Sequence, residues 1–196
     1  MPKCTRKKPK LVCGVGINDA DYVVQPKIDG KVVCCNFYRA WRNMIQRCYS
    51  EKYQSLKPTY IGCTVTKEWL VFSVFKSWME KQDWEGKSLD KDILIQSNKI
   101  YSSSTCIFVA NSINNILTNS TSSRGKYPVG VHFFKSSGKY MSQCSGKEGG
   151  AYLGCYDTPQ EAHQAYKAAK YKRIAEIANQ QSEPLRTALL NYVIEG

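Results

Sequence analysis

The stretch from Thr118 to Lys126, TNSTSSRGK, contains no apolar side chain. Such a segment cannot contribute to a hydrophobic core, and runs rich in serine, threonine and glycine are typical of linkers. We therefore expect a linker at residues 118–127 with a folded domain on each side. A chain of 196 residues is long enough for two small domains of this kind.

Beyond the linker, the sequence predicts three short strands followed by a long helix. The segments PVGVHFFK, GKYMSQCS and AYLGCYD are strand-like runs separated by glycine-containing turns. Thr158 is an N-cap residue, Pro159 suits the first helical position, and Glu161 is placed to complete a capping box. The helix should therefore begin at this point of the chain.

This predicted helix carries a face of small residues that would let it pack closely on a sheet. The face consists of Ala162, Ala165, Tyr166 and Ala169, and we expect His163, Lys167, Lys170 and Lys172 to lie largely elsewhere. Pro184 is expected to open a last short helix that contains Leu185, Leu189 and Tyr192.

The order GVHFF, SGKYMSQC and YLGCYDTPQEAHQAYKAA resembles the Apetala2/ethylene-response-factor DNA-binding domain over residues 127–175. That family's pattern is a Gly-Val strand, a Gly-Lys-aromatic strand, a Leu-Gly-x-aromatic strand and an alanine-rich helix. The resemblance implies a three-stranded antiparallel sheet that enters the major groove of double-stranded DNA, with the helix behind it.

Because successive strand residues point to opposite faces, alternation divides the sheet into a helix-facing set and a DNA-facing set. The helix-facing set is Val129, Val131, Phe133, Tyr140, Ser142 and Cys144. By the resemblance, the DNA-facing residues are His132, Phe134, Lys135, Lys139, Met141, Gln143, Ser145 and Tyr152. Family members usually contact bases with arginines, which this chain lacks at the corresponding positions, although Gln143 carries an amide that can pair with adenine.

Residues 37–117 are predicted to form a separate domain, after an arm and short strands in residues 1–36. From Phe37 the apolar residues recur with helical spacing, and Arg39 and Arg42 lie on the opposite face, where we expect them to contact DNA. A second, more apolar helix should follow Glu68. All four tryptophans lie in this half, which indicates a buried aromatic core.

The segment from Tyr38 to Ile116 resembles phage-encoded proteins related to the His-Asn-His nucleases, through YRAWRNMIQRCYS, PTYIGCTVTKEWLVFSVFKSWM and LDKDILIQSNKIYSSSTCIFVANSINNIL. The resemblance implies a ββα finger. Asp90 matches the family's first aspartate and Asn98 its loop asparagine, but Lys91 replaces the general-base histidine and Thr105 the late metal ligand. Lysine is protonated at neutral pH, so catalysis based on histidine is excluded.

Two interpretations of this segment stay open. One is a ββα shell that binds DNA without cutting it, in which the carboxylates form ordinary surface ion pairs and no cofactor is expected. The other is a magnesium-dependent nicking endonuclease: Asp90 and Asp92, two apart on a strand, would share a face and bind Mg²⁺ together with Asn98.

The composition agrees with a polyanionic partner. The formal net charge is +12, and five basic residues lie within the first ten. Two interpretations of these ten residues stay open: an arm that follows phosphates and a solvated tail. Nine cysteines without a Cys-x-x-Cys pair argue against a disulfide framework and a zinc ribbon. No apolar run approaches the roughly 20 residues of a membrane helix, and no secretory signal is present, so we expect a cytoplasmic protein.

Taken together, the sequence predicts an α+β protein with an arm and short strands (1–36), a His-Asn-His-nuclease-like domain (37–117), a linker (118–127) and an Apetala2-like domain (128–196). The expected function is non-catalytic binding of double-stranded DNA by a protein of phage or mobile-element type in a bacterial host. Two alternatives are the nicking endonuclease and an inhibitor of a host defence system that binds a host protein.

Overall fold

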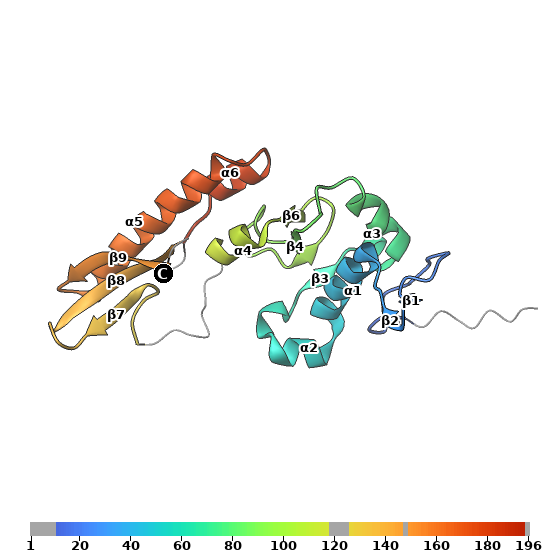
Figure 1. Cartoon of the computed structure of the whole chain (residues 1–196), viewed down its shortest axis with the longest axis horizontal. Helices are drawn as coiled ribbons and strands as arrows, with labels where there is room; N and C mark the ends of the chain where they lie inside the picture. The colour runs from blue at the N-terminus through green and yellow to red at the C-terminus, as the bar shows by residue number, and fades with distance from the viewer. Residues whose placement is uncertain (1–10, 118–125, 147–148, 195–196) are drawn as a thin grey trace, which may run out of the picture. The chain divides into compact units, whose positions relative to one another are not determined.

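A computed structural model gives the architecture of the chain and describes residues 11–117, 126–146 and 149–194. The predicted arm at 1–10 and most of the predicted linker lie outside the described residues. The fold is mixed α+β, as expected, and it divides into two compact units, Met1–Ala110 and Asn111–Gly196 (Figure 1). The division falls at residue 110, before helix α4 (Asn111–Leu117), whereas the sequence placed a domain boundary after residue 117.

The short strands expected within residues 1–36 include a hairpin that turns at Asp29-Gly30. Strand β1 (Lys27–Ile28) pairs antiparallel with β2 (Lys31–Val32). Asp29 has a φ of 50° and Gly30 a φ of 75°. A two-residue hairpin turn of type I′ requires positive φ at both central positions, and aspartate followed by glycine tolerates this conformation best.

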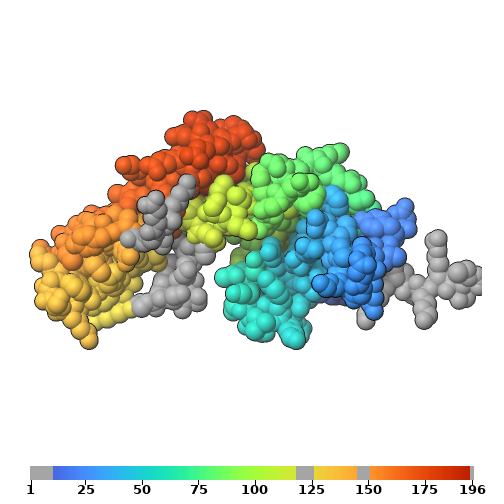
Figure 2. All heavy atoms as spheres, in the orientation of Figure 1, coloured from blue at the N-terminus to red at the C-terminus, as the bar shows by residue number. Residues whose placement is uncertain are grey.

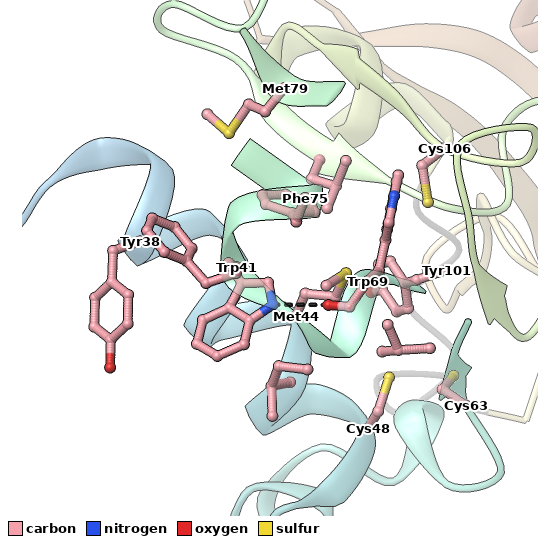
Figure 3. Close-up of a cluster of buried hydrophobic side chains, with 14 of the residues drawn as sticks. Tyr38, Trp41, Met44, Cys48, Cys63, Trp69, Phe75, Met79, Tyr101 and Cys106 are labelled. Carbon is pink, nitrogen blue, oxygen red and sulfur yellow. Dashed lines mark hydrogen bonds between the residues drawn. The ribbon is translucent and has the colours of Figure 1, made fainter. Parts of the chain in front are cut away.

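The core of the first unit forms where its helices meet. These are α1 (Asn36–Tyr49), α2 (Glu51–Leu56), α3 (Phe72–Met79) and the short 3-10 helices η1 (Pro58–Tyr60) and η2 (Lys67–Leu70). The predicted apolar face of α1 is confirmed, because Trp41, Met44 and Ile45 are completely buried. The Trp41 indole donates a hydrogen bond of 2.8 Å to the Trp69 carbonyl, which satisfies its buried N–H (Figure 3).

Two small strand pairs complete this unit. Strand β3 (Thr64–Val65) runs parallel to β5 (Ile100–Tyr101), and β4 (Ser88–Asp90) pairs antiparallel with β6 (Ile107–Val109). In the β4–β6 pair Leu89 lies opposite Phe108, and both side chains are buried. Strand β5 lies between β4 and β6 in the chain, and α4 follows β6 directly.

The second unit contains the predicted three strands and long helix. Strands β7 (Val131–Phe134), β8 (Lys139–Gly146) and β9 (Gly149–Tyr156) form an antiparallel sheet in that order, followed by α5 (Pro159–Ala178) and α6 (Leu185–Leu190). The capping box is confirmed: the Thr158 hydroxyl accepts the Glu161 N–H, and the Glu161 carboxylate accepts the Thr158 N–H, both at 3.2 Å. Helix α5 lies along one face of the sheet (Figure 1).

The buried side of α5 differs from the predicted one at Lys170. The buried residues follow a spacing of four and are Ala162, Tyr166, Lys170, Ile174 and Ala178. Lys170 is only 3% exposed, and its ammonium lies 5.6 Å from the centre of the Tyr166 ring. We expected this lysine to point away from the sheet. It is buried because it lies one helical turn after Tyr166, on the same face of α5. Burial lowers the pKa of Lys170.

A glycine lets β7 approach this helix closely. Gly130 has a φ of 80°, and a Cβ atom added there would lie 2.1 Å from Cδ2 of Tyr166. Any side chain would therefore both strain the backbone and collide with the ring. Among the described residues, no helix is both long enough and apolar enough to cross a membrane, and the eight described cysteines are all free thiols.

Candidate nucleic-acid interface

The strand register of the second unit separates its side chains into two faces, as predicted. Ser142 and Cys144 are buried on the side covered by α5. On the other side His132 pairs with Met141, and Met141 pairs with Cys155. We call this second side the open face; its described members are His132, Phe134, Lys139, Met141, Gln143, Tyr152 and Cys155.

Two large aromatic rings project from the open face. Tyr152 is 64% exposed and Phe134 is 45% exposed. Neither ring belongs to an aromatic cluster of the described residues, so neither is held by core packing. Figure 2 shows the region of β7 and β8 in yellow and orange at the surface of the second unit.

Phe133 is less buried than the alternation predicted. We expected it in the core beneath α5, yet it is 40% exposed. Its ring lies 5.3 Å from the Tyr140 ring and 6.5 Å from the Tyr127 ring. Tyr127, the last residue of the predicted linker, therefore packs against the sheet. These three rings form a cluster of their own. Phe133 and Tyr140 lie on the face of the sheet opposite the open face.

A β-bulge determines which residues of β9 reach the open face. Ser142 pairs with Gly154 and the next residue, Gln143, pairs with Tyr152, so Leu153 is an extra residue in β9. Tyr152 and Cys155 are three apart, which in a regular strand would place them on opposite faces. Because of the bulge they share a face, and the Tyr152 hydroxyl donates to the Cys155 thiol at 3.5 Å. The sequence alone gave no signal for Cys155.

The open face carries little free charge. Among its described strand positions Lys139 is the only cation, and its ammonium lies 3.1 Å from the Asp157 carboxylate. Both side chains are well exposed, so this pair contributes little to stability. Lys135 lies in the turn between β7 and β8 and is exposed, whereas the side chain of Ser145 lies outside the described residues.

The polar groups of the open face are available to a ligand. Gln143 and His132 are exposed, and within the described part of the chain their side chains accept or donate no hydrogen bond. His163, the other histidine, has a structural role instead. Its Nδ1 atom lies 3.0 Å from the Val129 carbonyl oxygen, and this contact ties α5 to the chain entering β7.

The two predicted DNA-contacting arginines of the first unit differ in environment. Arg39 is exposed, and its guanidinium donates to the Cys34 carbonyl at 3.1 Å. Arg42 is half-buried, and its Nε atom has no hydrogen-bond partner among the described residues. Both lie on α1, so any contact they make with DNA is a contact of the first unit.

The loop after β4 contains the residues predicted for a nuclease site. Strand β4 ends at Asp90, whose Oδ1 atom accepts the backbone N–H groups of Asp92 and Ile93, each at 2.9 Å. The expectation that Asp90 and Asp92 share a face of one strand is therefore wrong, because the chain turns immediately after Asp90. This turn, and no strand register, determines where Asp92 lies.

Asn98 holds the same loop closed. Its amide nitrogen donates to the carbonyls of Lys91 at 2.6 Å and Ile100 at 2.7 Å, and its side-chain oxygen accepts the Ile100 N–H at 3.2 Å. Both ends of the amide are therefore used within the loop. Thr105, at the position of the late ligand, donates its hydroxyl to the Ile100 carbonyl at 2.7 Å and has a structural role too.

Lys91 is a buried cation and cannot replace a catalytic histidine as a base. It is 6% exposed, and its ammonium lies 2.9 Å from the Asp92 carboxylate. Burial by itself would lower the pKa of Lys91, but the hydrogen bond and charge of Asp92 outweigh that effect and raise it. For Asp90, burial and the neighbouring Asp92 charge raise the pKa to about 6.

The described residues contain no group of three or more histidine, cysteine or acidic side chains arranged to bind a metal ion. Cys48 and Cys106 lie in the core of the first unit, where burial raises the pKa of each thiol to about 12. They therefore stay protonated at neutral pH and act as small core side chains (Figure 3).

In comparisons with known proteins, no protein-family model, no curated protein and no solved structure matched this chain. The open face and the Asp90 loop are therefore the two parts of the structure from which a function can be inferred.

Proposed function

We propose that this protein is a non-catalytic DNA-binding protein of phage or mobile-element type and that the open face of its second unit contacts the DNA. The observation that carries the proposal is the exposure of Phe134 and Tyr152 beside His132 and Gln143, whose side chains form no hydrogen bond within the described part of the chain. Exposed aromatic rings beside such polar groups are characteristic of binding surfaces.

The architecture of the second unit supports the same proposal. A three-stranded antiparallel sheet with one face covered by a helix is the arrangement that the Apetala2 resemblance implies. The net charge of +12 adds a general attraction to phosphates, because cations that neutralise phosphates release bound counterions. Arg39 on α1 would add to this attraction from the first unit.

The proposal is tested by fluorescence anisotropy with labelled DNA of one sequence, offered both as a duplex and as a single strand. We expect replacement of Phe134 and Gln143 by alanine to weaken binding at least tenfold, which is the scale of about 1–3 kcal/mol for a base contact. The melting temperature should change little, because neither side chain is packed in the core.

Leu190→Ala is the matched control, since Leu190 lies on α6 and is as exposed as Phe134, at 48%. It should leave DNA affinity unchanged. If wild-type protein binds neither form of DNA at low salt, the proposed function is wrong, and a protein partner becomes the leading alternative.

One observation favours the second candidate function, a magnesium-dependent nicking endonuclease. Burial and, after it, the neighbouring Asp92 charge raise the pKa of Asp90, and a divalent cation between the two carboxylates would offset both effects. Against it stand the hydrogen bonds that already occupy Asp90 Oδ1 and the Asn98 side chain. We expect no nicking of supercoiled plasmid with Mg²⁺ or Mn²⁺ compared with EDTA; nicking that is lost in Asp90→Ala would establish the enzyme instead.

A further inference from the structure

We infer that the open face binds unpaired nucleobases by stacking, as in single-stranded DNA, rather than lying in the groove of an intact duplex. This inference rests on the proposed function and names its substrate class. The duplex suggested by the Apetala2 resemblance is the competing outcome of the test below.

The first argument is the chemistry of the exposed rings. Phe134 and Tyr152 are 45% and 64% exposed, and neither ring has an aromatic partner among the described residues. Every nucleobase has a flat face that can stack on such a ring, whatever its identity. In a duplex these faces already stack on neighbouring base pairs, so a ring gains access only by wedging between them and kinking the helix. Unpaired bases pay no such cost.

The second argument is the charge of the open face. Proteins that lie in a duplex groove reach phosphates with lysine and arginine and contact guanine with arginine. Of the described strand positions on the open face, none is arginine, and the single lysine, Lys139, is paired with Asp157. The face therefore offers rings and hydrogen-bonding groups to bases and little charge to a backbone.

The third argument is the spacing of the rings. Phe134 lies on the edge strand β7 and pairs with Lys139 of β8. Tyr152 lies on the opposite edge strand β9 and pairs with Gln143, four residues further along β8. With strands about 4.8 Å apart and a rise of about 3.3 Å per residue, the rings lie roughly 16 Å apart on a diagonal. The His132–Met141 pair lies between them. Sheets that bind single strands in this way stack two or three bases on such a surface.

The fourth argument is the fixed position of Tyr152. Its hydroxyl reaches back to Cys155 on the same face, which is possible only because of the bulge at Leu153. This hydrogen bond ties the end of the ring to the strand position of Cys155, and the Gln143 amide at the paired position can bond the edge of a base stacked on the ring. A ring held in this orientation loses little freedom when a base stacks on it.

The test compares the full chain's affinity for one mixed sequence as single-stranded DNA, as duplex DNA and as single-stranded RNA. We expect the single strand to bind at least tenfold more tightly than the duplex. Phe134→Ala and Tyr152→Ala should each weaken single-strand binding about tenfold, whereas Phe134→Tyr and Tyr152→Phe, which keep the ring, should retain it. The RNA strand shows whether the ribose hydroxyl is tolerated.

A base analogue whose fluorescence is quenched by stacking, placed within the single strand, gives an independent signal. The quenching should be lost in Tyr152→Ala and kept in Leu190→Ala. Duplex binding as tight as single-strand binding would overturn this inference while leaving the proposed function intact. Alanine variants that keep single-strand affinity would overturn both the stacking and the assignment of DNA contact to the open face. Failure to bind any of these nucleic acids would overturn both.

Discussion

In the first unit the large aromatic side chains are buried, whereas in the second several of them face solvent. Trp41, Phe72 and Phe75 are at most 1% exposed, while Phe134 and Tyr152 are 45% and 64% exposed. The same residue class therefore stabilises one unit and supplies a binding surface to the other. Counting aromatic residues in the sequence does not separate these roles, because the exposed ones are recognised only by the face of the sheet on which they lie.

The net charge, unlike the exposed rings, is not concentrated in the second unit. Residues 1–10 contain five basic and no acidic residues, residues 11–110 contain thirteen basic and ten acidic, and residues 111–196 contain ten basic and six acidic. The net charges of these three segments are +5, +3 and +4, so the general attraction to phosphates is spread along the chain. The open face, whose one described strand cation is paired with Asp157, must obtain its affinity from stacking and hydrogen bonds.

The largest effect that would sharpen this comparison is expected from Trp41→Ala. Truncation of this buried indole leaves a cavity and removes the hydrogen bond to the Trp69 carbonyl, so we expect a loss of about 3–5 kcal/mol in the free energy of unfolding. Phe134→Ala should change it by less than about 0.5 kcal/mol, as is usual for surface positions. In urea denaturation, tryptophan fluorescence follows the first unit, which holds all four tryptophans, and circular dichroism follows both units. Equal losses would mean that the open face is part of a core.

A smaller effect, with a defined pH dependence, is expected from Asp90→Asn in the first unit. Folding raises the pKa of Asp90 from 3.8 to about 6, so the ionised carboxylate destabilises the fold. This cost is absent below about pH 4, grows as the pH rises and is complete above about pH 6. Asparagine keeps the acceptor oxygen for the Asp92 and Ile93 N–H groups without the charge.

We therefore expect Asp90→Asn to stabilise the protein on the order of 1–3 kcal/mol at pH 7.5 and to have little effect at pH 4. Urea denaturation at the two pH values measures the difference. A stabilisation of equal size at both would show that the titration of Asp90 is not its cause.

The smallest effect is expected from Thr158→Ala in the second unit. The substitution removes the side-chain oxygen that accepts the Glu161 N–H, and loss of an N-cap typically costs about 1 kcal/mol. Thr158→Ser keeps this oxygen and should be close to wild type in thermal denaturation. DNA affinity should be unchanged in both variants, since the cap lies at the start of the helix behind the sheet. A binding defect would show that α5 takes part in recognition.

Several features were predictable because they depend on neighbours in the sequence. The capping box at Thr158 and Glu161 uses residues three apart, and the Asp29-Gly30 turn follows from the backbone conformations that these two residues tolerate. The buried face of α1 follows from helical periodicity. Strand alternation places Ser142 and Gln143 on opposite faces of the sheet. Local geometry fixes each of these without knowledge of the rest of the fold.

Other features were decided by the tertiary structure. Lys170 is buried because the sheet covers the turn of α5 that follows Tyr166, and a lysine stem is long and apolar enough to fit there. Asp92 leaves the strand because Asp90 bonds the next backbone groups. Cys155 joins the open face because one extra residue in β9 shifts its register against β8. Sequence periodicity determined which side chains could share a face. Pairing between distant segments determined where that periodicity was interrupted, because strand partners and buried neighbours depend on contacts between residues far apart in the chain.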